Sequence, residues 1–196
     1  IACCLVGSEM CIRDRIASAF GEFATQHISS HVLIQPRRFA LMDIRHATIG
    51  DAEALREIYN HEVENSTATF DLVPRTLDEQ RAWIREREGA LGVLVAEIDG
   101  RVMGFSSLSP YRNRPAYNTT VENSVYVHAD ARGLGVGKRV LTEIVDMAKA
   151  RGFHTVLAHI SDAEGASVAL HQSCGFKVVG VQKEVGRKFG TWLDVT

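Results

Sequence analysis

The chain has 196 residues, of which 45% are hydrophobic and 23% are charged, and its formal net charge is −2. This composition predicts one soluble globular domain that is large enough to bury a substantial core. The small net charge argues against a general nucleic-acid-binding or membrane-surface protein. No apolar run approaches the roughly 20 residues that are needed to cross a bilayer, so we expect neither nucleic acid nor membrane as a partner.

The four cysteines form neither a disulfide framework nor a metal-binding pattern. Cys3, Cys4 and Cys11 lie in the first eleven residues, and Cys174 stands alone near the end. A reducing cytoplasm is therefore the expected compartment. His27 and His31 are four residues apart but have no third partner at ligand spacing, so we expect no metal site.

Residues 1–41 differ from the rest because they lack sustained periodicity, and the chain begins with Ile rather than Met. The apolar run Ile1–Val6 is too short for a signal-peptide core and has no basic residues before it. We predict that Met42 is the natural start and that residues 1–41 are a non-native, mostly disordered extension, with room for a short helix over 13–23. The alternative is a genuine, poorly packed extension.

From residue 43 onward, hydrophobic periodicity and turn residues predict a regular series of elements. Asp51 is expected to cap a first helix, in which apolar residues from Ala54 to Tyr59 recur at helical spacing. Thr76-Leu77-Asp78-Glu79 predicts a capping box, and Asp99-Gly100 predicts a type I′ hairpin. The predicted strands are 43–47, 91–98, 101–109, 119–128, 155–160, 176–181 and 192–196, and the other predicted helices are 76–88, 136–151 and 166–173.

A glycine-rich loop separates the fourth predicted strand from the third predicted helix: Arg132-Gly133-Leu134-Gly135-Val136-Gly137-Lys138. Its glycines let the backbone curl so that several N–H groups point at one spot, at the positive end of the following helix. This arrangement predicts an anion site best suited to phosphate. It is not a Walker loop, because Arg139 follows Lys138, and its glycine spacing differs from the dinucleotide-binding motif. A nucleotide-binding protein is therefore disfavoured.

The predicted order β-α-α-β-β-β-α-β-α-β-β is a mixed α/β (α+β) arrangement. Residues 43–196 resemble the GNAT superfamily of acyl-CoA N-acyltransferases, through the loop at 132–137 and the later run Leu170–Phe176. Within it, the chain is similar to the phosphinothricin and methionine sulfone/sulfoximine N-acetyltransferases, at Ile58–His61, Thr120–His128 and Val185–Asp194. The resemblance implies a domain over 42–196 with a twisted, mostly antiparallel central sheet flanked by helices. It also implies a final strand cut short at Thr196.

The resemblance further implies direct transfer of an acetyl group from acetyl-CoA, as co-substrate, to a small-molecule amine, by a homodimer. The cofactor's pantetheine would pair with the strand Val125-Tyr126-Val127, and its pyrophosphate would lie on the loop from Arg132 to Lys138. Ser173 would bond to the CoA arm, whereas Cys174 would pack rather than act as a nucleophile. The expected acceptor is the α-amino group of a small amino acid or analogue, such as methionine sulfone, methionine sulfoximine or phosphinothricin.

Glu122 and His171 are the candidate catalytic residues. Glu122, three residues before Val125, is the expected base for the acceptor's ammonium group, directly or through water. Without the resemblance, a solvated charge at a strand end would be the preferred interpretation. His171 occupies the position where many superfamily members carry a Tyr that protonates the leaving thiolate. It could donate that proton or only pack and hydrogen-bond, and we favour the second.

The segment Tyr111–Tyr117 is expected to bind the acceptor. A carboxylate needs a fork of donors, which Arg112, the better match to the family, or Arg114 can supply. Tyr117 would wall the side-chain pocket together with Pro115 and Ala116. The alternative interpretation is a mobile, solvated basic loop.

Two rival functions remain open. The same chemistry could act on a polyamine, an aminoglycoside or a protein N-terminus, although a polyamine would favour an acidic pocket over Arg112. A non-catalytic acyl-CoA-binding module gains some weight from Glu164, where relatives carry an Asn that contacts pantetheine, because an ionised Glu has no donor. The presence of Glu122 argues against such a module.

Overall fold

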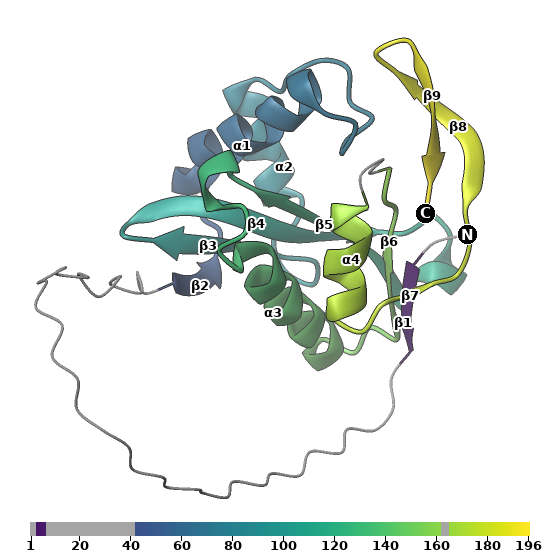
Figure 1. Cartoon of the computed structure of the whole chain (residues 1–196). Coiled ribbons are helices and arrows are strands. Elements are labelled where there is room, and N and C mark those ends of the chain that lie inside the picture. The colour runs from purple at the N-terminus through teal and green to yellow at the C-terminus, as the bar shows by residue number, and fades with distance from the viewer. Residues whose placement is uncertain (1–2, 7–41, 162–164) are drawn as a thin grey trace, which may run out of the picture.

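The computed structural model describes residues 3–6, 42–161 and 165–196 (Figure 1). The predicted helix over 13–23, the histidines at 27 and 31 and the family contact at Glu164 lie outside the described residues. The extension over 1–41 and the natural start at Met42 remain predictions.

Seven strands form one mixed sheet in the order β2-β3-β4-β5-β6-β1-β7, and a separate hairpin holds β8 and β9. Among the described strands of this sheet, only β5 and β6 pair in parallel, and the other neighbours are antiparallel. The predicted mixed, mostly antiparallel sheet is therefore confirmed. The strands are β1 (Cys3–Val6), β2 (Met42–His46), β3 (Val93–Ile98), β4 (Arg101–Pro110), β5 (Thr120–Val127), β6 (Thr155–Ala158), β7 (Lys177–Val178), β8 (Gln182–Lys188) and β9 (Thr191–Val195).

Helices cover both faces of the sheet (Figure 1). Phe105 and Val95 face α1 (Ala52–Asn65) and α2 (Leu77–Arg85), whereas Leu108 faces α3 (Val136–Ala150). Both sets arise from the two-residue alternation of side chains along β3 and β4. The remaining helical elements are α4 (Ala166–Ser173), on the α3 side, and the short 3-10 turns η1 (Ile49–Asp51), η2 (Pro115–Tyr117) and η3 (Ala129–Ala131).

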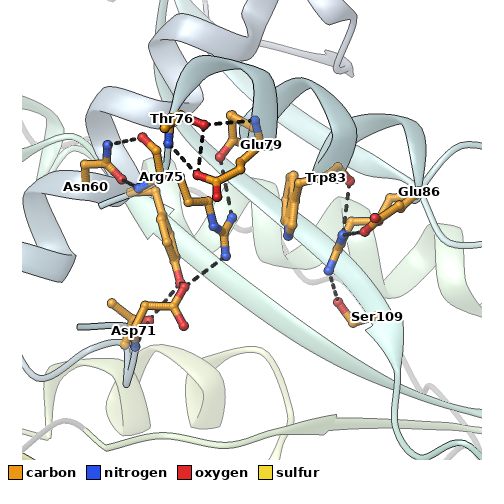
Figure 2. A network of polar contacts seen from close by, with 12 residues as sticks. Asn60, Asp71, Arg75, Thr76, Glu79, Trp83, Glu86 and Ser109 are labelled. Atoms are coloured by element: carbon orange, nitrogen blue, oxygen red, sulfur yellow. Dashed lines mark hydrogen bonds and ion pairs between the residues drawn. The ribbon is translucent and has the colours of Figure 1, made fainter. Parts of the chain in front are cut away.

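Two local predictions are confirmed in detail. Asp99 and Gly100 both have positive φ, 51° and 77°, as a type I′ turn requires. Thr76 donates its backbone N–H to the Glu79 carboxylate (2.7 Å) and accepts from the Glu79 N–H (3.3 Å), which completes the capping box (Figure 2). Both signals are contained within four residues, so they do not depend on the rest of the fold.

The predicted cap at Asp51 is wrong in its mechanism. The Asp51 carboxylate accepts the Thr48 backbone N–H (2.7 Å) and both terminal nitrogens of Arg45 (2.8 Å each), and it makes no cap bond to α1. Thr48 precedes Asp51 by three residues, which is the spacing of a capping box. The Asp51 side chain therefore bonds to Thr48 at the start of η1 and not to the N–H groups of α1.

The sheet edge beyond β6 differs most from expectation. The predicted strand over 176–181 is reduced to β7. The sequence does not predict β8, whose regular alternation of side chains is interrupted by Gly186 and by the positive φ of Glu184 (52°). β1 was not expected, and its backbone pairs with both β6 and β7. Thr196 also pairs with Ile160, so β1 and the residue after β9 lie in line along one edge of β6.

Candidate functional site

β5 and β6 separate in the middle of the sheet. Their parallel pairing runs from Thr120 to Glu122, and its last pair joins Glu122 to Leu157. Beyond Glu122, β5 continues to Val127 with only β4 beside it, so among the described residues the β6-facing edge of 123–127 has no ladder partner. The predicted cofactor strand, Val125-Tyr126-Val127, lies in this unpaired stretch.

The glycine-rich loop continues directly from that edge. Gly133 and Gly135 have φ of 76° and 83°, which glycine adopts without strain. The first N–H of α3 with a backbone acceptor is that of Arg139, bonded to the Gly135 carbonyl (3.0 Å). The N–H groups of the three preceding residues have no backbone acceptor among the described residues, as expected at a helix start. These three are Val136, Gly137 and Lys138.

The residues of the glycine-rich loop and of the end of α4 differ in what they contact. Val136 is fully buried in the core around α3, and the exposed Leu134 makes no core contact. A Cβ on Gly137 would lie 3.1 Å from a methyl group of Leu170, so glycine lets α4 approach α3. Ser173, at the end of α4, donates its hydroxyl to the Leu170 carbonyl (2.8 Å). Cys174 packs partly against the α3 core.

Arg132 does not stand free beside the loop. Its guanidinium pairs with the carboxylate of Glu62 on α1, whose side chain is only 8% exposed. Glu62 was missed by the sequence analysis, although it follows Ile58 by four residues and so falls on the buried face of α1. A carboxylate at such a position requires a cationic partner, which was the available signal.

Glu122 meets a histidine that sequence analysis also missed. Nδ1 of His159 lies 3.1 Å from Oε1 of Glu122, and both side chains are about one-third exposed, 27% and 31%. The His159 ring is stacked on Tyr111, with centroids 6.1 Å apart and an interplanar angle of 10°. His159 therefore links Glu122 to Tyr111, the first residue of the predicted acceptor segment.

His171 lies on the other side of the sheet. Its Nε2 is 3.2 Å from Oδ1 of Asn123, and its Nδ1 is 2.7 Å from the Ser167 carbonyl. The ring is only 3% exposed, and this burial lowers the pKa of His171. Successive strand residues point to opposite faces, so Glu122 and His171 approach the unpaired edge of β5 from its two sides. No contact between them occurs in the described structure.

The predicted acceptor segment is organised by aromatic contacts. Tyr111 and Tyr117 meet edge to face (5.4 Å), and the guanidinium of Arg112 lies 5.0 Å from the Tyr111 ring centre. Arg112 and Arg114 are exposed, and neither has a carboxylate partner among the described residues. Pro115 and Ala116 are exposed in η2. An unbroken series of contacts thus joins Arg112 to Glu122 through Tyr111 and His159.

A second polar network lies on the α1 side of the predicted cofactor strand (Figure 2). The Tyr59 hydroxyl donates to Asp71 (2.6 Å), Arg75 stacks on the Tyr59 ring (3.7 Å), and Asn60 exchanges two hydrogen bonds with the Arg75 backbone (2.8 and 2.9 Å). The Tyr59 ring also packs edge to face on Tyr126 (5.1 Å). Burial raises the pKa of both tyrosines above the ordinary value of 10.

The described residues contain neither a cluster of metal-ligating side chains nor a helix that could span a membrane. No group of three or more His, Cys, Asp or Glu there is placed to hold a metal ion. None of the helices in 42–161 and 165–196 is long and apolar enough to cross a membrane.

Residues 53–176, which include both motifs at the β5 edge, match the acetyltransferase (GNAT) family. The chain belongs to this family. The GNAT fold and the N-acetyltransferase activity inferred from the sequence are thereby confirmed.

Individual relatives of this GNAT chain are similar over most of their length. The L-methionine sulfoximine/L-methionine sulfone acetyltransferase of Pseudomonas aeruginosa is 37% identical over 155 residues, which are 78% of this chain and 90% of the relative. A phosphinothricin acetyltransferase from Sinorhizobium meliloti, solved with acetyl-CoA, is 36% identical with a TM-score of 0.76, covering 79% of this chain and 84% of that one. A ribosomal-protein-alanine N-acetyltransferase from Brucella melitensis is 42% identical with a TM-score of 0.76, covering 78% and 94%.

Proposed function

We propose that this GNAT acetyltransferase moves the acetyl group of acetyl-CoA to the α-amino group of a small amino acid or analogue, of the methionine sulfone, methionine sulfoximine or phosphinothricin type. The observation that carries the proposal is the contact series from Arg112 to Glu122. It places an exposed cation and a carboxylate in one cluster, and an α-amino acid presents the complementary pair of charges, a carboxylate and an ammonium group. The names of two of the relatives support the same acceptor class.

Acetyl-CoA fits the unpaired edge of β5 and the loop that follows it. The amides of pantetheine can pair with the backbone of Val125, Tyr126 and Val127, as an added strand does. The pyrophosphate would accept the unpaired N–H groups at the start of α3, where the helix dipole also favours an anion. Lys138 is exposed there and adds a positive charge.

In the proposed reaction, Glu122 accepts a proton from the acceptor's ammonium group. The resulting amine attacks the thioester carbonyl carbon, and the tetrahedral intermediate collapses with cleavage of the C–S bond. The nitrogen releases its surplus proton to solvent to give the neutral amide, and the departing CoA thiolate takes up a proton from solvent. We assign His171 a positioning role, because both of its ring nitrogens already face partners inside the fold. This assignment follows the packing interpretation that the sequence favoured.

We also propose a homodimer formed through the β8–β9 hairpin. Val185, Phe189 and Trp192 on this hairpin are between 54% and 61% exposed, and Leu72 and Val73 on the α1–α2 connection are 69% and 75% exposed. Phe70 contacts Gly186 and so joins the two segments into one apolar surface. Light scattering should give twice the chain mass, and Trp192→Glu should give the monomer. A monomeric wild type would contradict this proposal.

The first test of function is thiol release from acetyl-CoA with methionine sulfone, phosphinothricin or spermidine as acceptor. We expect amine-dependent release with the two amino-acid analogues, reduced about 10²- to 10⁴-fold in Glu122→Gln. Release with spermidine alone would keep the chemistry and reject the acceptor pocket. Binding of acetyl-CoA with no release would favour the non-catalytic module.

A peptide with an N-terminal alanine belongs in the same assay, because one relative carries the name of a ribosomal-protein-alanine acetyltransferase. Such a peptide has no α-carboxylate beside its amine, so it gives Arg112 no partner. Arg112→Gln should therefore raise the KM for methionine sulfone and leave any activity on the peptide unchanged.

The cytoplasmic location also remains a prediction, based on the cysteine pattern.

A further inference from the structure

His159 lies where β6 ends and turns away from β5. Glu122 pairs with Leu157 in the parallel register, and His159 is two residues further along. Residues two apart on an extended chain share a face, so His159 and Glu122 are on the same side of the sheet. This backbone arrangement places the imidazole beside the carboxylate at the end of the β5–β6 pairing.

The contact between them joins one ring nitrogen to one carboxylate oxygen. Nδ1 of His159 lies 3.1 Å from Oε1 of Glu122, and an ionised Glu122 can only accept, so a hydrogen bond between them requires the hydrogen on Nδ1. A glutamate that is one-third exposed has several side-chain torsions free to move. Contact with an imidazole that is itself stacked on Tyr111 reduces that freedom.

The face of the same ring supports the acceptor segment. Ser109 pairs with Glu122 and β4 ends at Pro110, so Tyr111 leaves the sheet two residues beyond the partner of Glu122. The Tyr111 ring stacks on His159 with an interplanar angle of 10°. The same ring also contacts Tyr117 and the guanidinium of Arg112. One imidazole therefore touches both the group that deprotonates the acceptor and the segment that binds it.

We propose that His159 is a positioning residue that aligns the base and the acceptor with one another. The Nδ1–H orients Glu122, which affects the chemical step, and the ring face orients Tyr111, which affects acceptor binding. This inference rests on the proposed amino-acid acetyltransferase function. It adds a specific residue that ties the two halves of that site together across 37 positions of sequence, from 122 to 159.

The two contacts can be separated by substitution. His159→Asn retains an N–H donor close to the position of Nδ1 but removes the ring face. His159→Phe retains the ring face but removes the donor. For His159→Asn we expect a KM for methionine sulfone that is raised about fivefold or more with nearly unchanged kcat. For His159→Phe we expect the reverse, a kcat lowered about tenfold with nearly unchanged KM.

Tyr111→Leu is the matched control for the stacking contact. It should raise the KM for the acceptor as His159→Asn does, and combining the two should add little, because both remove the same contact. The KM for acetyl-CoA and the melting temperature should stay near those of the wild type in all three variants. A purely structural role would instead move all of these quantities together.

A measurement independent of turnover tests the Nδ1–H directly. Proton–nitrogen correlation spectra of the ¹⁵N-histidine-labelled protein at mildly alkaline pH should show His159 protonated on Nδ1, and Glu122→Gln should change that signal. If the ring carries its hydrogen on Nε2 in the wild type, the proposal is wrong.

The kinetic outcomes also separate the two proposals. A wild type that is active on methionine sulfone, with kcat and KM changed alike in His159→Asn and His159→Phe, overturns the role of His159 alone. A wild type with no amine-dependent thiol release overturns the proposed function and this inference with it.

Discussion

Asn123 and His171 join β5 to α4: the amide oxygen of Asn123 lies 3.2 Å from Nε2 of His171, and both side chains are only 3% exposed. Because Asn123 directly follows Glu122, this contact holds β5 at the residue where its pairing with β6 stops. The edge that is proposed to receive acetyl-CoA is therefore fixed from the α4 side by a buried polar contact.

Replacing His171 with Phe should leave the Asn123 amide buried without this partner, at a cost of about 1–3 kcal/mol in the free energy of unfolding.

The stability of the wild type should also depend on pH. Burial lowers the pKa of His171 below its ordinary value of 6.5, so the unfolded chain binds the proton more readily. Stability from this group is complete above pH 6.5 and falls as the pH drops below it.

Urea denaturation of the wild type and of His171→Phe across this pH range measures both effects. The difference in unfolding free energy between them should shrink as the pH falls. A constant difference would mean that His171 is not held neutral by its burial.

Gly135 and Gly100 form a matched pair for testing the anion site. Both have positive φ, 83° and 77°, and an added Cβ at either position would meet nothing within 4 Å. Alanine should therefore cost each about 1 kcal/mol of stability through backbone strain alone. Only Gly135 lies at the start of α3.

Isothermal titration with acetyl-CoA separates the two variants. Gly135→Ala should weaken binding about fivefold or more, because the loop must relax away from the geometry that aims its N–H groups. Gly100→Ala, in the distant β3–β4 hairpin, should bind as the wild type does. Equal affinities in both would place the pyrophosphate elsewhere.

The sequence predicted the parts of this structure whose causes are local. The turn at Asp99-Gly100 and the box at Thr76 and Glu79 depend on residues within four positions of one another. The loop at Gly133 and Gly135 could likewise be read as a helix entry. In each case the backbone conformation is set by the residue types themselves, so tertiary contacts have little to change.

The partners of the site residues depended on register and helix placement instead. The contact of His159 with Glu122 requires β6 to run parallel to β5 with Leu157 opposite Glu122. The pair of Arg132 with Glu62 spans 70 positions and requires α1 to pack beside the loop. Sequence patterns indicated neither arrangement, so the contacts that organise the candidate site had to come from the structure.

The Arg132–Glu62 pair should behave as a coupled unit. Arg132→Met leaves the carboxylate of Glu62 buried without a cation, and we expect a loss of about 2–3 kcal/mol, below the full value for a buried pair because Arg132 is half exposed. Glu62→Gln removes the charge and should cost less. The double variant should be more stable than Arg132→Met alone, as measured by denaturant unfolding. Additive effects would show that the two side chains do not interact.

Arg45 on β2 pairs with Asp51, and this contact makes the stability of the fold depend on pH. Its hydrogen bonds, aided by the Thr48 N–H and opposed by burial, hold the pKa of Asp51 at about 2, below the ordinary 3.8. A carboxyl group with a lowered pKa in the folded state stabilises the fold at pH values above its unfolded pKa. That contribution should be complete above about pH 4 and should be lost as the pH falls toward 2.

Asp51→Asn removes the charge while keeping the size of the side chain. At neutral pH we expect it to lower the free energy of unfolding by about 1 kcal/mol, a value reduced for solvent screening because the Arg45 side chain is 34% exposed. Thermal unfolding of both proteins from neutral pH down toward pH 2 should show the gap closing as Asp51 becomes protonated in the wild type. Asp78→Asn, in an exposed pair with Arg81, is the control and should change stability little at any pH. A gap that persists unchanged in acid would mean that Asp51 acts through its shape and its neutral hydrogen bonds, and that its charge contributes nothing.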